Sequence, residues 1–367
     1  MTNVTADEVV EELRLTPQQT LALRTMQARM LLADVNAESK NDTVVSKTEY
    51  LHSFVSESFR TAVPDPTDPA EWLPDDLATF EGHTTDEQVE IFAGLAPVLA
   101  GQVRDRSAAL IVLVELLTFS PWDDGSKWDK KSRVSSLELA ATELAGLRDG
   151  DLKTMTEEFE SLMKALRRKS VRWGRVAAAT VVGAGIGVLT AGWAAPAIGG
   201  AIGGAMGLTG AAATSAGLAA LGGGSLAAGG FGIAGGTLLL SGVGGFAFAG
   251  AAAAGTRFSP LASRTIAAEA VKLDLVARMV LADAPNRDEK IRRVVESLQE
   301  TINDLSDRTK LLVDRIESLK AEKSSADAEN TTLRDQIKAL KAELDGIRAA
   351  TTTLTVVRDR LPKSVTA

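Results

Sequence analysis

The apolar positions of the first 170 residues recur mostly at helical spacing. In "LTPQQTLALRTMQARMLLADV" they include Leu21, Met26 and Leu31, and Thr16 before Pro17 is a typical helix start. "RVSSLELAATELAGL", residues 133–147, has the same spacing. We find no convincing alternation of the kind that predicts strands. The pattern therefore predicts an all-α fold with a helical N-terminal domain.

Two stretches of this first part depart from simple amphipathic spacing. Residues 107–119, "SAALIVLVELLTF", are apolar nearly all round but too short to cross a bilayer, so we expect a buried core helix. Residues 62–86 contain four prolines, which predicts a loop or an irregular excursion.

The last part of the chain carries a seven-residue repeat of apolar positions. Such a repeat, sustained over residues 286–350, predicts a coiled coil. The seam is weak around Lys323, Ala326 and Asn330, where it either fixes register in a continuous helix or marks a hinge at which the helix folds back. The unbroken register favours the continuous helix, although a long helix can also pack its seam on the protein's own body. The seam residues are Leu298, Leu305, Leu312, Leu319, Leu333 and Leu340.

Between these parts lies a segment, residues 176–256, with no charged residue at all. It is 81 residues long and contains 24 glycines and 25 alanines. An uncharged apolar run of about 20 residues already predicts a membrane helix. The segment is therefore long enough for up to four spans or two hairpin arms. The alternative is a Gly/Ala-rich helical core buried inside a soluble protein.

Glycines in this segment recur four residues apart, which places them on one face of a helix. Glycine inside a helix in water costs about 1 kcal/mol relative to alanine. In a bilayer, the same small residues allow close packing between helices. We expect the Gly/Ala-rich segment to insert as helical hairpins that pack through these positions. They are Gly199, Gly203 and Gly207, with Gly200 and Gly204 beside them.

The residues that flank the uncharged segment are basic. Because positive residues lie on both sides, we expect both flanks on the cytoplasmic face and an even number of crossings. The basic segment, residues 164–175, would contact anionic lipid headgroups. Its cations are Lys164, Arg167, Arg168, Lys169, Arg172 and Arg175.

Composition excludes several classes of site. The chain has no cysteine and only two histidines, which excludes thiolate metal sites and disulfides. The net charge of −8 gives no support for nucleic-acid binding. No phosphate-binding loop, nucleophile elbow or complete dinucleotide fingerprint is found, so we expect no cofactor and no enzyme. The N-terminus shows no secretory signal, which predicts residence in a bacterial-type cytoplasm.

The run "DDGSKWDKKSRVSSLELAATEL" is followed along the chain by the Gly/Ala-rich phrase "AGWAAPAIGG". Through these two stretches, residues 105–256 resemble the N-terminal part of transmembrane and coiled-coil domain proteins. It implies a helical domain followed by a membrane region. The α/β-hydrolase domain of that family is missing here, so its activity is not implied.

The helix–DG–helix unit at 108–147 is similar to TerB-like domains of tellurite-resistance and stress proteins. That similarity implies acidic metal ligands near the turn, and Asp123, Asp124 and Asp129 fit them. Lys130 and Lys131 stand where a further acid would help to bind the ion. The alternative is a solvated Asp-Gly turn.

These observations predict a membrane-associated helical protein whose Gly/Ala-rich segment inserts into or permeabilises a bilayer, in the manner of a bacterial defence or stress effector. The alternative is a membrane-anchored scaffold that recruits partners or self-associates through its coiled coil. The expected place is the cytoplasmic side of the inner membrane, with or without a soluble state before a trigger. The expected parts are a helical domain (1–163), a basic segment (164–175), the Gly/Ala-rich segment (176–256), a connecting helix (257–285), a coiled coil (286–350) and a tail (351–367).

Overall fold

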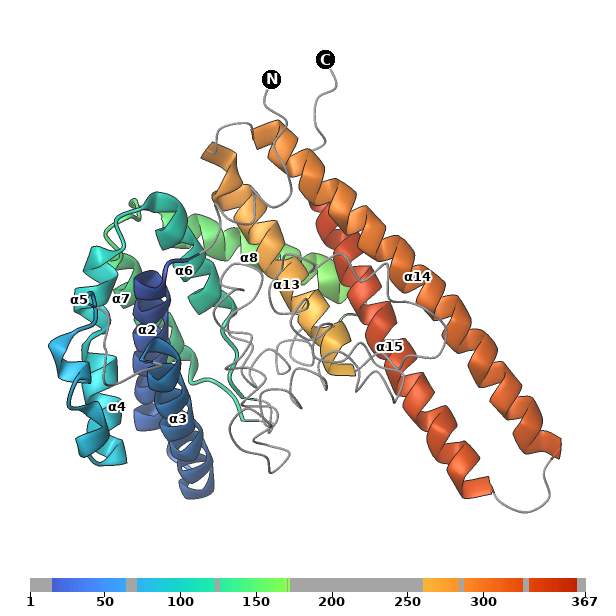
Figure 1. The fold of residues 1–367 in the computed structure, drawn as a ribbon. Helices are drawn as coiled ribbons and strands as arrows, with labels where there is room; N and C mark the ends of the chain where they lie inside the picture. The colour runs from blue at the N-terminus through green and yellow to red at the C-terminus, as the bar shows by residue number, and fades with distance from the viewer. Residues whose placement is uncertain are drawn as a thin grey trace.

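The computed structural model describes residues 15–63, 71–122, 126–169, 171, 260–283, 287–325 and 330–361. All regular structure within these ranges is helical, so the predicted all-α class is confirmed (Figure 1). The helices are α2 (Pro17–Ala37), α3 (Asn41–Ala62), α4 (Thr85–Gly94), α5 (Ala96–Gln102), α6 (Arg106–Thr118), α7 (Lys130–Glu143), α8 (Asp151–Arg168), α13 (Pro260–Met279), α14 (Arg287–Ser325) and α15 (Asn330–Arg360). Short 3-10 turns are η1 (Asp75–Leu77), η2 (Phe80–Gly82) and η5 (Leu281–Asp283).

Helices α2 to α8 form one assembly, here called the N-terminal body. Helix α2 packs against α3, α4, α5, α6 and α7 (Figure 1). It begins at a capping box in which Thr16 accepts from the backbone N–H of Gln19, and the Gln19 side chain accepts from the N–H of Thr16. Its apolar residues Leu21, Met26 and Leu31, identified from their spacing, are buried.

Helix α6 is buried nearly all round, as its sequence predicts. Every residue from Ala108 to Thr118 is buried, because the helix packs against α2, α7, α8 and α13. Asp105 caps its start by accepting from the N–H of Ala108 at 2.8 Å. The one acid in this run, Glu115, is buried with it.

The start of α8 is fixed against the start of α6. Asp151, the first residue of α8, accepts two hydrogen bonds from the Arg106 guanidinium at 2.7 and 3.0 Å. It also accepts one from the backbone N–H of Arg148 at 2.7 Å. Gly150 before it has φ +91°, a left-handed conformation that favours glycine. Gly146 is pressed so closely on α6 that an added Cβ would lie 2.6 Å from the Asp105 carbonyl oxygen.

Helices α13, α14 and α15 form a second assembly, here called the C-terminal unit. Helix α15 lies between α13 and α14, and α13 packs on α6 and α8 of the N-terminal body (Figure 1). The end of the α14–α15 hairpin near Ser325 and Asn330 projects beyond the other described helices (Figure 1).

The prediction of one continuous C-terminal helix is wrong. Helix α14 ends at Ser325, α15 begins at Asn330, and the two lie side by side, so the chain folds back as the alternative proposed. The sequence from Ser324 to Asn330 reads "SSADAEN", where small and polar residues replace the apolar seam and give little reason for a helix to continue.

The seam positions lie mainly inside the C-terminal unit. Leu298, Leu305, Leu312 and Leu319 are buried, whereas Leu333 and Leu340 are half-buried. Residues 351–360, assigned to the tail, continue α15, and Leu354 and Val357 are fully buried there. This end of α15 contacts its neighbours on two sides, which explains why its buried face is wider than a two-helix seam.

Candidate functional site at the joint between the two assemblies

The two flanks of the Gly/Ala-rich segment belong to different assemblies. The chain leaves the N-terminal body at the end of α8 and enters the C-terminal unit at Pro260, the first residue of α13. Helix α8 contacts both α13 and α15. The interface between the N-terminal body and the C-terminal unit therefore determines how these two flanks are held, and it is the candidate functional site.

The basic end of α8 is exposed. Lys164, Arg167, Arg168 and Lys169 all have exposed side chains, and Val171 just beyond them is buried. The cations lie in the last turns of the helix, where positive charge complements the helix dipole. Arg172 and Arg175 lie outside the described residues.

A network of two arginines and two carboxylates, here called the clamp, joins three helices across the interface. It consists of Glu158 from α8, Asp274 and Arg278 from α13, and Arg360 from α15. Arg360 Nε donates to Asp274 Oδ1 at 3.1 Å, and its Nη2 donates to Glu158 Oε2 at 2.9 Å. Its Nη1 donates to Ser161 Oγ at 2.9 Å. One guanidinium thus connects α8, α13 and α15.

Arg278 closes the same network from α13. Its Nε lies 3.2 Å from Asp274 Oδ2, and its Nη1 lies 3.4 Å from Glu158 Oε2. Its Nη2 also donates to the backbone carbonyl of Arg360 at the end of α15. The clamp therefore holds the end of α15 through both a side chain and a main-chain oxygen.

Burial is the strongest influence on the central carboxylate of the clamp. The Asp274 side chain is 0% exposed, and this desolvation raises the pKa of Asp274 although Arg360 and Arg278 act to lower it. A buried charge with two cationic partners is stable as a set but costly to separate. Loss of either arginine would leave Asp274 with less compensation.

A second buried ion pair crosses the interface between α6 and α13. Lys272 Nζ lies 2.8 Å from Glu115 Oε2, and the two side chains are 5% and 1% exposed. Arg24 on α2 lies in the field of Glu115 and sits over the Phe54 ring, 5.2 Å from its centroid. Burial lowers the pKa of Arg24 to about 10. Three charges from three helices thus share one interior region.

Another buried cation, Lys47 on α3, lies within the N-terminal body. Its Nζ is 2.8 Å from Asp34 Oδ2 and 3.1 Å from Glu38 Oε2, and it donates to the Lys127 carbonyl at 2.9 Å. The Trp122 ring centroid lies 5.1 Å away. The Lys47 ammonium therefore connects α2 and α3 to Trp122 and Lys127.

The proposed metal ligands are only partly described. Asp129 caps α7 by accepting from the N–H of Ser132 at 2.8 Å, and this bond lowers the pKa of Asp129. Asp123 and Asp124 lie outside the described residues. Within the part of the chain that the structure describes, no group of three or more His, Asp or Glu side chains is placed to hold a metal ion.

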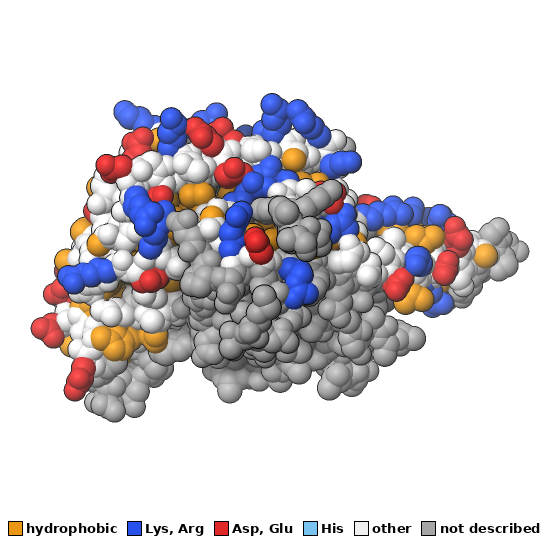
Figure 2. Space-filling model, turned by 90° about the horizontal axis from the view of Figure 1, so that it is seen from above, with side chains coloured by type: hydrophobic (Ala, Val, Ile, Leu, Met, Phe, Trp, Pro, Cys, Tyr) orange, Lys and Arg blue, Asp and Glu red, His pale blue; other side chains and the backbone are white. Residues whose placement is uncertain are grey.

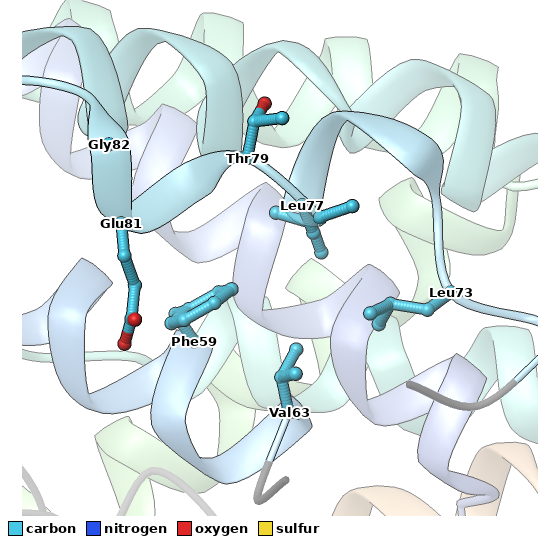
Figure 3. Close-up of a pocket in the computed structure, with 8 residues that line it drawn as sticks. Phe59, Val63, Leu73, Leu77, Thr79, Glu81 and Gly82 are labelled. Carbon is cyan, nitrogen blue, oxygen red and sulfur yellow. The ribbon is translucent and has the colours of Figure 1, made fainter. Parts of the chain in front are cut away.

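An apolar pocket of about 300 Å³ lies between the end of α3 and the turns η1 and η2. Phe59, Val63, Leu73 and Leu77 point into it, and Glu81 is the one carboxylate of its lining (Figure 3). This lining contains no pair of groups suited to nucleophilic or acid–base chemistry. The remaining lining residues are Ala78, Thr79 and Gly82.

The described surface carries charges of both signs. Figure 2 shows basic and acidic side chains beside one another, with hydrophobic side chains in small groups between them. None of the described helices combines the length and apolar character needed to cross a membrane. The glycines Gly199, Gly200, Gly203, Gly204 and Gly207 lie outside the described residues, so their packing stays a prediction.

Sequence reasoning did not identify the residues of the clamp or the Glu115–Lys272 pair. Glu115 carried a signal, because an acid inside a helix that is apolar all round has to be buried and needs a cation. Its partner lies 157 residues further along, on the far side of the Gly/Ala-rich segment. No signal in the sequence pointed to Arg360, because it lies beyond the last heptad of the predicted coiled coil, in the stretch expected to be a tail.

The chain matches no known protein family, no curated protein and no solved structure.

Proposed function

We propose that the protein acts at membranes and that its Gly/Ala-rich segment inserts into a bilayer, where close helix packing permeabilises it. The observation that carries this proposal is the run of 81 residues without a charge, 176–256, between basic flanks. The cations at the end of α8 support it, since their exposed side chains can meet anionic headgroups. A role as a defence or stress effector fits such an activity. The resemblance to transmembrane and coiled-coil domain proteins, which implies a membrane region after a helical domain, also supports the proposal.

The joined flanks support an even number of crossings. Helices α8 and α13 contact each other, so the segment leaves from the N-terminal body and returns to a C-terminal unit that packs against it. Together the two assemblies carry charges of both signs on their described surface, which keeps them on one side of a bilayer (Figure 2). A hairpin or a pair of hairpins meets both conditions.

A second candidate is a membrane-anchored scaffold. The projecting end of the α14–α15 hairpin favours it, because a long helical arm offers a surface for a partner or a second copy (Figure 1). The buried leucines Leu305, Leu312 and Leu319 already pack within the chain, so a partner would have to contact the outer face of the hairpin. The Gly/Ala-rich segment would then serve only as an anchor.

Dye release from vesicles tests the proposal. We expect the full-length protein to release carboxyfluorescein from vesicles of equal parts phosphatidylglycerol and phosphatidylcholine. The variant Gly203→Leu/Gly207→Leu should release it about tenfold more slowly, which corresponds to about 1.4 kcal/mol. Gly94→Leu is the matched control, because Gly94 ends α4 with nothing within 4 Å of an added Cβ.

The outcomes separate the two candidates. Tight sedimentation with vesicles without dye release would favour the scaffold over the permeabilising protein. Protein that neither sediments with anionic vesicles nor releases dye would overturn both membrane roles. Equal release by the double variant and by wild type would show that the glycine face is not the packing surface.

A further inference from the structure

The interface between the N-terminal body and the C-terminal unit contains buried charge in addition to its apolar contacts. The clamp and the Lys272–Glu115 pair both cross it, and Asp274, Lys272 and Glu115 are each at most 5% exposed on their side chains. Apolar side chains of similar volume often stabilise such a site as well or better. Such a network separates at less cost when the whole interface opens, because water then solvates both partners, than when one partner alone is lost and the other stays buried.

The chain connects the two sides of this interface through the Gly/Ala-rich segment, so opening of the interface changes how the ends of that segment are held. Helix α8 ends at Arg168 on one side and α13 begins at Pro260 on the other, and the stretch that joins them contains the whole Gly/Ala-rich segment. When the clamp is closed, the spacing of these two attachment points is fixed. When it is open, the spacing is free to follow whatever arrangement the segment adopts.

We propose that the clamp is a releasable joint, and that separation of the C-terminal unit from the N-terminal body is the conformational step that allows the segment to enter a bilayer. This inference rests on the proposed function. The two events are then linked: whatever favours separation favours insertion, and an anionic bilayer that binds the segment favours separation to the same extent.

A single thiol at the interface measures the opening. The chain contains no cysteine, so Ala268→Cys introduces the one reactive group, here called the interface thiol. Ala268 is 1% exposed and lies four residues before Lys272, on the helix face that meets Glu115 of α6. The rate at which a thiol reagent labels the interface thiol under native conditions reports how often this face opens.

The comparison uses two neighbouring arginines of α15. Arg360→Gln removes the contacts to α8 and α13, whereas Arg358→Gln removes contacts to Gln299 of α14 and to Asp359, both within the C-terminal unit. We expect Arg360→Gln to raise the labelling rate of the interface thiol about fivefold or more, within the range of typical coupling energies. Arg358→Gln should leave it within about twofold of the parent, as expected for a change outside the interface.

A second reporter and a second variant separate opening from unfolding. Ala28→Cys places a thiol in α2, where Ala28 is 0% exposed in the interior of the N-terminal body. Its labelling should not respond to Arg360→Gln. Arg360→Lys keeps the charge but lacks the guanidinium that donates to Asp274, Ser161 and Glu158. It should therefore give an intermediate labelling rate at the interface thiol.

Vesicles complete the test. Phosphatidylglycerol/phosphatidylcholine vesicles should accelerate labelling of the interface thiol in the otherwise wild-type chain, and pure phosphatidylcholine vesicles should not. Equal labelling in Arg360→Gln and Arg358→Gln would overturn the joint. Dye release with no accelerated labelling of the interface thiol would overturn its link to insertion. A contrast between the arginine variants without any dye release would retain the joint and overturn the proposed membrane function.

Discussion

At the scale of single residues, two buried aspartates have pKa values that are shifted in opposite directions. Asp151 receives two hydrogen bonds from Arg106 and one from the Arg148 backbone, and these lower the pKa of Asp151. Asp274 lies deeper, and desolvation raises the pKa of Asp274 despite two arginine partners. The balance between hydrogen bonding and burial therefore decides the sign of each shift.

The substitution Asp151→Asn tests this balance. The pKa of Asp151 is lower in the folded than in the unfolded chain, so its stabilising effect is present above about pH 4 and is lost as pH falls through the folded-state pKa. We expect the free-energy difference between wild type and Asp151→Asn to be largest near neutrality and to shrink in acid. Urea unfolding at several pH values measures it.

Asp274→Asn serves as the control with the opposite sign. A folded-state pKa that is raised makes the contribution of Asp274 greatest at low pH and smaller as pH rises through that pKa. The stability of wild type relative to Asp274→Asn should therefore increase in acid. Parallel pH profiles for the two variants would contradict the assigned environments.

At the scale of helices, the sequence predicted which residues form helices better than it predicted how the helices are connected. The helical class and the apolar seam followed from spacing, because burial of one face imposes a 3.5- to 3.6-residue period. The buried character of α6 followed instead from apolar residues on every side of that helix. The fold-back of α15 on α14 did not follow, since the seven-residue register of the sequence runs unbroken from one helix to the next. An unbroken seven-residue repeat indicates which face of each helix is buried, but it does not indicate whether the two helices are continuous.

Adjacent leucines in α14 test which face forms the seam. Leu312 is 5% exposed and Leu311 is 52% exposed. We expect Leu312→Ala to lower the free energy of unfolding by about 2–4 kcal/mol, as for other buried leucines. Leu311→Ala should change it by less than about 0.5 kcal/mol. Urea titration followed by circular dichroism measures both, and equal losses would mean that α14 does not use this face against α15.

At the scale of the whole molecule, the charges at the joint could not be paired from the sequence. Glu115 and Lys272 lie on opposite sides of the 81-residue uncharged segment, and only the fold brings α6 and α13 together. A residue pattern predicts that a buried acid needs a cation, but it does not identify which cation. Sequence reasoning therefore named the basic residues beside the candidate site but did not identify the clamp or the Glu115–Lys272 pair inside it.

The Glu115–Lys272 pair gives a direct measure of how strongly the two assemblies are coupled. Lys272→Met leaves Glu115 buried without this partner and should cost about 3–5 kcal/mol of unfolding free energy. The double variant Lys272→Met/Glu115→Leu should recover a large part of that loss, because it also removes the buried carboxylate that Lys272→Met deprives of this cation. A double-mutant cycle from urea unfolding measures the coupling. Additive losses in the double variant would mean that the two charges do not depend on each other, and that apolar contacts alone hold α13 on α6.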